Sequence, residues 1–251
     1  MKTNHCSTTT AMAFAVALSF GAHAAAQSPA ALPAHSSVAI IHVKPDMLDE
    51  WVDLEKNEVI PAQKKGGLAS RTTYHTVRGN PFEYVIVTPF EKWATFDGTS
   101  PQIRALGTDG SSRLGAKLRK CEESVQVFVS NPIPELSNTP NTEIPLIGVY
   151  TRVRVATGRM QEYQNFLKTE ILPIYKKSNV RYTVLRRGLG ANNNDLTQVT
   201  FVGDKYADLD AGSPLTRALG ADGVAKLMAK TAGMTTLIEQ VVRRRVPELS
   251  Y

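Results

Sequence analysis

The sequence contains few of the residues that build common catalytic and metal-binding motifs. Only two cysteines and five histidines occur in 251 residues. No H-E-x-x-H, zinc-spaced Cys/His cluster, G-x-S-x-G or G-x-G-x-x-G fingerprint is present. The sequence therefore gives no support for a zinc protein, an α/β-hydrolase or a dinucleotide-dependent enzyme. We predict neither a metal site nor a cofactor.

A concentration of charge of one sign is also lacking. Lysine and arginine number 29 against 23 acidic residues, a formal net charge of +6. Apart from Arg243 to Arg245, the excess is spread along the chain, without the basic stripe that nucleic-acid binding needs. We therefore predict no nucleic-acid partner. The diffuse positive charge favours anionic small molecules or the surface of the cell envelope.

The first 26 residues have the composition of a secretory signal peptide. Lys2 precedes an uncharged, alanine-rich stretch from Ala11 to Ala26, and Ala22 and Ala24 offer an A-x-A-like cleavage site. The apolar run is too short for stable membrane insertion. Cleavage would also remove Cys6, and one remaining cysteine cannot form an internal disulfide. We predict a secreted or periplasmic protein.

The rest of the chain is an internal duplication. Matching residues recur 113 positions further on, and toward the front of each repeat the shift is 112 positions. One loop therefore differs in length by a single residue between the two repeats. We place the first repeat at residues 36–137, a linker at 138–141 and the second repeat at 142–251. The matches include Ser100-Pro101 with Ser213-Pro214, Arg104 to Gly107 with Arg217 to Gly220, Pro134 to Ser137 with Pro247 to Ser250, and Glu58 to Pro61 with Glu170 to Pro173.

Each repeat alternates strand and helix periodicity in the order β-α-β-β-α-β. In the first repeat, a β-branched run at 38–43 precedes helical spacing, and two strand-like runs flank Gly79-Asn80-Pro81. Ser100 is a helix N-cap, the helix should break near Gly107 to Gly110 and resume to Cys121, and a strand closes the repeat. This is the ferredoxin-like order. We predict an α+β fold of two tandem ferredoxin-like repeats packed sheet to sheet as a pseudo-dimeric α+β barrel.

The repeat order, its length and the E-x-x-P-x-x-K-K pattern at Glu58 to Lys65 and Glu170 to Lys177 resemble the dimeric α+β barrel superfamily. The NIPSNAP-like proteins and the small antibiotic-biosynthesis monooxygenases belong to it. The resemblance covers nearly all of the chain after the leader and implies a ligand pocket, and in some members haem. It assigns no catalytic role to any residue here, because no diagnostic motif of one family is present.

Strand alternation indicates which side chains line the space between the sheets. Ile41 and Val43 should lie under the helices, which places His42 on the opposite face. In the second repeat the same argument places Val153 and Val155 under the helices, and Tyr150, Arg152 and Arg154 opposite them. His42 could act as a base beside an anion held by the two arginines. The alternative is a solvated sheet face without chemistry.

Three further residues lie on the second strand of the two repeats. His75 is a candidate for catalysis or haem ligation, although a histidine within a strand is more often structural. Tyr182 and Arg186 are candidates for anion binding. The paired Glu58 and Glu170 we interpret as structural, because each precedes a proline and a lysine pair near a helix end.

These observations lead to an exported small-molecule-binding protein with a pocket between two pseudo-symmetric sheets. The alternative is a cofactor-independent oxygenase or isomerase acting on an aromatic or quinone-like compound, as the resemblance to small monooxygenases implies. A third hypothesis is an assembly protein that forms oligomers through exposed sheet edges.

Overall fold

The computed structural model describes Met1, residues 32–140 and residues 143–251. The predicted signal peptide, apart from Met1, and part of the predicted linker lie outside the described residues. No helix in the part of the chain that the structure describes is long and apolar enough to cross a bilayer.

The described chain contains the predicted element order twice. The first repeat comprises β1 (His35–Val43), α1 (Leu48–Leu54), α2 (Ile60–Lys65), β2 (Thr72–Arg78), β3 (Glu83–Phe90), α3 (Pro101–Cys121) and β4 (Glu122–Pro132). The second repeat comprises β5 (Ile147–Val155), α4 (Met160–Phe166), α5 (Leu172–Lys177), β6 (Tyr182–Arg187), β7 (Asp195–Gly203), α6 (Pro214–Ala229) and β8 (Thr235–Arg245).

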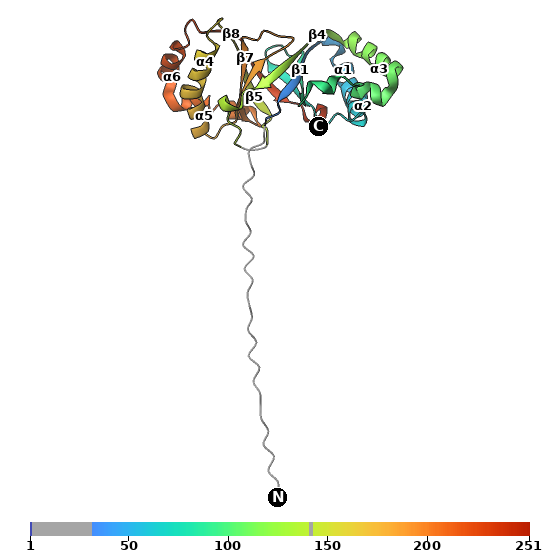
Figure 1. Ribbon diagram of the computed structural model, residues 1–251, viewed down its shortest axis with the longest axis horizontal. Coiled ribbons are helices and arrows are strands. Elements are labelled where there is room, and N and C mark those ends of the chain that lie inside the picture. The colour runs from blue at the N-terminus through green and yellow to red at the C-terminus, as the bar shows by residue number, and fades with distance from the viewer. Residues whose placement is uncertain (2–31, 141–142) are drawn as a thin grey trace.

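The eight strands form one closed antiparallel barrel in the order β1-β3-β2-β8-β5-β7-β6-β4. Each repeat supplies four neighbouring strands, and the two sheets join along two seams, β2 with β8 and β4 with β6. The helices of the two repeats cover opposite outer sides of the barrel (Figure 1). The predicted α+β barrel of two ferredoxin-like repeats is therefore confirmed, with the bare sheet faces forming the barrel interior.

Each repeat has a π-helical turn in its first helical region, at Glu55–Val59 and at Leu167–Ile171. Pro61 and Pro173 follow these turns and lack the N–H that would continue the regular hydrogen-bond pattern. A widened turn accommodates this loss. The E-x-x-P pattern thus coincides with a π-helical turn in both repeats.

The third helix of each repeat begins and bends as predicted. The Oγ atoms of Ser100 and Ser213 accept hydrogen bonds from backbone N–H groups three residues on. Gly107 has φ 71° and Gly220 has φ 68° within α3 and α6, a conformation that glycine adopts without strain. Both helices are therefore kinked, and they cover the sheet unevenly.

The repeated glutamates, which we interpreted as structural, each form an ion pair. Glu58 forms an ion pair with Lys117 at 2.7 Å, and Glu170 forms one with Lys230 at 2.8 Å. Each pair connects the π-helical turn of its repeat to the region of the third helix, on the surface of the molecule.

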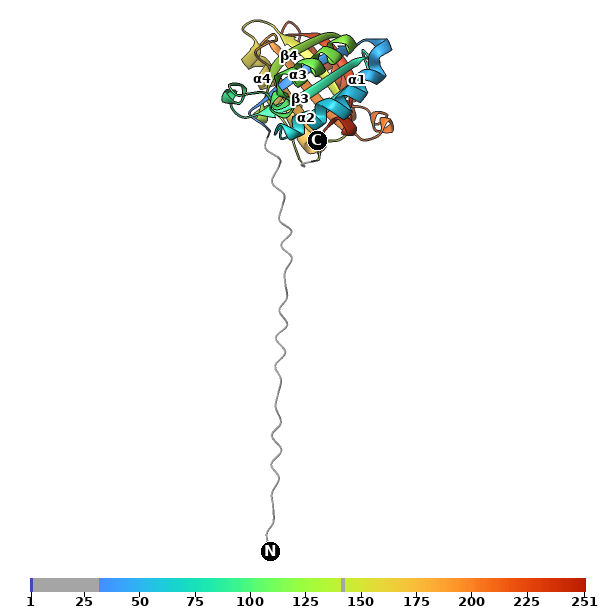
Figure 2. The same ribbon diagram turned by 90° about the vertical axis from the view of Figure 1, so that its right-hand side faces the viewer.

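Two short segments cross from one repeat to the other. Pro134–Leu136 follows β4, yet Leu136 is 2% exposed in the core of the second repeat. Pro247–Leu249 follows β8, and Leu249 is 1% exposed in the core of the first repeat. The C-terminus accordingly lies beside α2 in both views (Figures 1 and 2). We call these two the crossing segments; each closes the core of the other repeat.

A buried ion pair lies under the helices of the first repeat. Arg71 is 1% exposed and Glu55 4%, with Nη2 of Arg71 at 2.9 Å from Oε2 of Glu55. Arg71 also donates to the side chains of Gln63 and Thr73. The second repeat has apolar and aromatic residues at the corresponding places, so the two helix-covered cores differ in polarity.

Candidate functional site

The barrel interior has an apolar middle and a charged end. Nine buried side chains pack together in the middle: Val38, Ile40, Tyr74, Val85, Phe128, Tyr150, Val199, Phe201 and Val241. Val38, Ile40 and Tyr150 lie on the strand faces that were predicted to point between the sheets. Ile41, Val43, Val153 and Val155 lie in the two cores under the helices, again as predicted.

Glu83 is the centre of the charged end. Its Oε1 accepts hydrogen bonds from Thr76 Oγ1 at 2.6 Å and from Arg243 Nη2 at 2.8 Å, and its Oε2 lies 3.3 Å from His42 Nε2. Burial by itself raises the pKa of this carboxyl group, but Arg243, Thr76 and His42 together lower it below its ordinary value. Glu83 is therefore ionised and stabilises the fold at neutral pH.

This arrangement predicts an acid-sensitive contribution to stability. The pKa of Glu83 is lower in the folded than in the unfolded chain. The ionised carboxylate therefore contributes fully to folding stability above the unfolded pKa, and this contribution is lost as the pH falls through the folded pKa. We expect Glu83→Gln to lower the free energy of unfolding by about 1–3 kcal/mol at pH 7 and to flatten its decline in acid. Urea unfolding at neutral and acidic pH measures both. An unchanged acid decline in the variant would contradict the assignment.

Arg187 is buried at the same end, at 4% exposure. Its guanidinium lies over the Phe128 ring at 4.3 Å, and Nε donates to Thr197 Oγ1 at 3.5 Å. Burial, together with the neighbouring Arg152 and Arg243, lowers its pKa to about 10. It nevertheless stays charged at neutral pH, and it forms no ion pair within the part of the chain that the structure describes.

A cavity of about 550 Å³ occupies the other end of the barrel interior. We call it the barrel cavity. Both repeats line it, and its polar members include Tyr74, Tyr150 and Arg181, while Glu91 contributes from an exposed position. This cavity is the predicted space between the two sheets.

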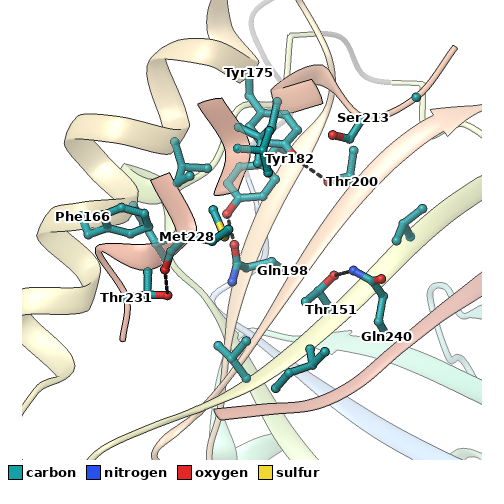
Figure 3. A pocket seen from close by; sticks show the side chains of 18 of the residues that line it. Thr151, Phe166, Tyr175, Tyr182, Gln198, Thr200, Ser213, Met228, Thr231 and Gln240 are labelled. Carbon is teal, nitrogen blue, oxygen red and sulfur yellow. Dashed lines mark hydrogen bonds between the residues drawn. The ribbon is translucent and has the colours of Figure 1, made fainter. Parts of the chain in front are cut away.

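A second cavity, of about 450 Å³, lies between the sheet and the helices of the second repeat. We call it the helix–sheet cavity (Figure 3). Aromatic and aliphatic side chains from both the helices and the strands of the second repeat form most of its wall. Its polar members are all uncharged at neutral pH: Thr151, Tyr163, Tyr175, Tyr182, Gln198, Thr200, Ser213, Thr231 and Gln240.

Hydrogen bonds organise the polar side of the helix–sheet cavity. Tyr182 Oη donates to Gln198 Oε1 at 2.6 Å, and Gln198 Nε2 donates to Tyr163 Oη at 2.8 Å. The rings of Tyr175 and Tyr182 are stacked, with centroids 4.1 Å apart, and the Tyr175 hydroxyl bonds Thr200 (Figure 3). The amide of Gln198 thus holds two tyrosine hydroxyls in fixed directions.

The tyrosines of this cavity do not titrate at neutral pH. Burial raises the pKa of Tyr163 to about 12, and it raises the pKa values of Tyr175 and Tyr182 as well. All three hydroxyls are therefore protonated and neutral. Among the described residues that line the cavity there is no carboxylate, histidine or lysine that could serve as a general base.

The lining of the helix–sheet cavity differs from the equivalent positions of the first repeat. Strand pairing aligns Thr151 and Gln198 with Ala39 and Ile86 of the first repeat. The same alignment places Tyr182 at the position of Arg71. The hydrogen-bonded polar side of the cavity is therefore a property of the second repeat alone.

The two predicted catalytic histidines lie apart from both cavities. His42 is on the interior face but at the charged end, where Ser124 Oγ lies 2.9 Å from its Nδ1. His75 faces outward, stacked on Tyr84 at 4.7 Å, and its Nε2 is 2.7 Å from the Pro81 carbonyl oxygen. Neither histidine lines the barrel cavity or the helix–sheet cavity, so their catalytic role stays a prediction.

The predicted ligand-binding residues are divided among different places. Tyr150 lines the barrel cavity, and Tyr182 lines the helix–sheet cavity. Arg152 lies within the charged end, 4.0 Å from Glu239. Arg154 is half exposed and paired with Asp195 at 2.8 Å, and Arg186 is exposed and donates to the Asn193 carbonyl. The structure does not bring these five residues into one site.

Pattern reasoning from the sequence did not identify Gln198, Tyr163, Arg181 and Arg187. The first two lie on different elements, and only strand register shows that they meet. Arg181 and Arg187 are the sequence neighbours of the predicted residues Tyr182 and Arg186, but they lie on the interior face of the sheet. One signal in the sequence could have revealed Gln198. The equivalent residue of the first repeat is Ile86, and a glutamine on a strand face that packs in the core needs a polar partner.

The lining of the helix–sheet cavity does not fit a haem, the cofactor that the family resemblance raised. Nε2 of His75 is directed at a backbone carbonyl, and the described residues that line the helix–sheet cavity include no histidine, cysteine, lysine or arginine. The hydroxyls of its three tyrosines are already hydrogen-bonded. No cluster of three or more acidic, histidine or cysteine side chains suited to a metal occurs in the residues described.

Comparisons with known proteins support the fold. The structure is similar to an anthrone oxidase-like protein, with TM-score 0.55 and 10% identity, covering 86% of this chain and 94% of that one. It is similar to a monooxygenase candidate from Fusobacterium nucleatum, with TM-score 0.53 and 12% identity over 84% and 91% of the chains. A chlorite dismutase variant from Candidatus Nitrospira defluvii gives TM-score 0.50 and 8% identity over 86% and 92%.

No protein-family model and no curated protein sequence matches the chain. At these low identities the structural likeness shows the fold alone. The fold is a duplicated, ferredoxin-like α+β barrel, the architecture that the predicted resemblance to the dimeric α+β barrel superfamily implies. The narrower resemblance to NIPSNAP-like proteins stays a prediction.

Proposed function

We propose that this chain is an exported protein that binds a neutral, planar aromatic molecule bearing carbonyl groups, such as a quinone, in the helix–sheet cavity. The observation that carries the proposal is the bonded set Tyr182, Gln198 and Tyr163 beneath the stacked ring of Tyr175. Stacked aromatic walls favour a flat ring system, and fixed neutral dipoles favour a carbonyl over an ion.

The size and charge of the cavity support this ligand class. A volume of about 450 Å³ suits a two- or three-ring molecule. Because the described lining carries no formal charge, a charged ligand would lose its hydration without gaining a partner. The pocket that the sequence predicts between the sheets corresponds to the barrel cavity, whose charge suits a different ligand.

The name of one fold neighbour agrees with an aromatic ligand, since anthrone is a tricyclic aromatic ketone. The neighbours are named as an oxidase, a monooxygenase and a dismutase, but the lining of the helix–sheet cavity does not favour catalysis here. A cofactor-independent oxygenase needs a base to deprotonate its substrate. The helix–sheet cavity offers only neutral groups among its described residues. Binding is therefore the function that the geometry supports best, and the oxygenase is the alternative.

The proposal of export rests on the composition of the first 26 residues: a basic residue, an alanine-rich apolar run and a small-residue cleavage site. The mass of the intact protein recovered from a periplasmic fraction tests it. A chain that keeps its first 26 residues would contradict export through cleavage.

Gln198→Ile tests the site, because isoleucine is the residue of the first repeat at this place. The change leaves two tyrosine hydroxyls without their partner, and we expect menadione to bind about tenfold more weakly. Equilibrium dialysis measures this. Gln161→Ile, on the exposed face of α4, is the control and should bind as the wild type does.

Equal menadione affinity in wild type and Gln198→Ile would refute the site. Oxygen uptake with anthrone above the rate of its spontaneous oxidation would favour the oxygenase alternative over simple binding.

A further inference from the structure

The barrel cavity lies on the pseudo-twofold axis that relates the repeats. Strand register makes Val38 equivalent to Tyr150 and Val87 equivalent to Val199, and all four line the cavity. Thr72 and Thr183 are a further equivalent pair on its wall. The remaining apolar wall comes from both halves: Leu32, Pro33, Pro89, Pro132, Ile144, Leu185 and Phe201.

The two halves differ in charge at one place on this wall. Arg181 and Ser70 occupy equivalent positions, two residues before Thr183 and Thr72, and both line the cavity. Arg181 is 7% exposed, and its guanidinium lies 5.8 Å from the centre of the Phe201 ring. Duplication has therefore placed a single arginine on one side of an otherwise apolar and hydroxyl-bearing chamber.

A second arginine adds positive charge near the same chamber. Arg245 precedes the C-terminal crossing segment, and its Nε is buried without a hydrogen-bond partner among the described residues. Both Arg181 and Arg245 favour the ionised form of Tyr74, which shows that their fields reach the cavity wall. Burial raises the pKa of Tyr74 more strongly than these charges lower it, so its hydroxyl stays neutral.

The Tyr150 hydroxyl is a further polar group at the inner end of the cavity. Tyr150 is 8% exposed, and its hydroxyl has the hydroxyl of Tyr74 as its hydrogen-bonding neighbour. The centroids of the two rings are 5.7 Å apart. When one hydroxyl of such a pair donates to the other, the second keeps a proton that it can donate to a ligand oxygen in the cavity.

We propose that the barrel cavity is a second binding site, distinct from the helix–sheet cavity, and that it takes an apolar monocarboxylate. The carboxylate would pair with Arg181 and accept from the tyrosine hydroxyls, while the hydrocarbon part fills the apolar wall. A volume of about 550 Å³ accommodates an acyl chain or a ring system of moderate size. Among the described residues that line the cavity, the only carboxylate is that of Glu91, which is exposed.

Decanoate and decanol together test the proposal on the purified protein. They share one chain length and differ in charge, so isothermal titration should show decanoate binding about tenfold or more tightly than decanol. Arg181→Met should remove this preference, and Arg181→Lys should keep most of it. Arg186→Met removes the same charge from the exposed face of β6, the strand that begins directly after Arg181, and should bind as the wild type does.

Absence of decanoate binding, equal binding of decanoate and decanol, or an unchanged preference in Arg181→Met would each overturn the proposal. If Arg181→Met does not fold, the comparison of decanoate with decanol in the wild type decides. Gln198→Ile should leave decanoate binding unchanged and Arg181→Met should leave menadione binding unchanged, so failure at one cavity is distinguishable from failure at the other.

Discussion

Replacing Arg71 by methionine is expected to lower the free energy of unfolding by about 3–5 kcal/mol. The variant leaves Glu55, 3% exposed, without the guanidinium that lies 2.9 Å from it. It also removes the donors to Gln63 and Thr73. An unpaired carboxylate in this core must either stay charged in an apolar place or take up a proton. Chemical denaturation followed by circular dichroism measures the loss.

The double variant Glu55→Leu with Arg71→Met separates lost charge pairing from lost packing. The second repeat carries Leu167 and Tyr182 at the equivalent places, so this layer of the fold accepts uncharged side chains there. We expect the double variant to recover most of the stability, because a buried ion pair is often replaceable by packed apolar groups. A double variant no more stable than Arg71→Met alone would show that packing, and not pairing, is what Arg71 supplies.

Leu249→Ala is expected to lower the free energy of unfolding by about 2–5 kcal/mol, although only two residues follow Leu249 in the sequence. Leu249 is 1% exposed among Ile41, Val43 and Trp51 of the first repeat. The substitution opens a cavity in that core and loosens the crossing segment. Thermal and urea unfolding measure the effect.

Two controls accompany Leu249→Ala. Leu136→Ala makes the equivalent change in the other crossing segment and should cost a similar amount. Leu189→Ala, at a side chain 67% exposed, should change stability by less than about 0.5 kcal/mol. A loss at Leu249 no larger than that at Leu189 would mean that the crossing segment does not close the core.

Much of the fold could be predicted because its signals are local and occur twice. The duplication fixed the repeat unit, Ser100 and Ser213 marked two helix starts, and Gly107 and Gly220 marked two kinks. Strand alternation placed β1 and β5 correctly, because one face of each is clearly more apolar than the other.

The candidate site was less predictable. In β6 the outward residues are Tyr182, Val184 and Arg186, and the inward ones include Thr183, Leu185 and Arg187. Both faces mix polar and apolar side chains, so strand alternation does not show which face of β6 points into the barrel. The seams β2 with β8 and β4 with β6 join residues far apart in the chain, and no local pattern specifies them.

The crossing segments also set an order for folding during synthesis. Because Leu249 belongs to the core built around Trp51, the half of the molecule that leaves the ribosome first cannot be completed until the last few residues have been made. The nascent chain therefore has no early, independently closed half, and the two repeats should unfold and refold in a single cooperative step.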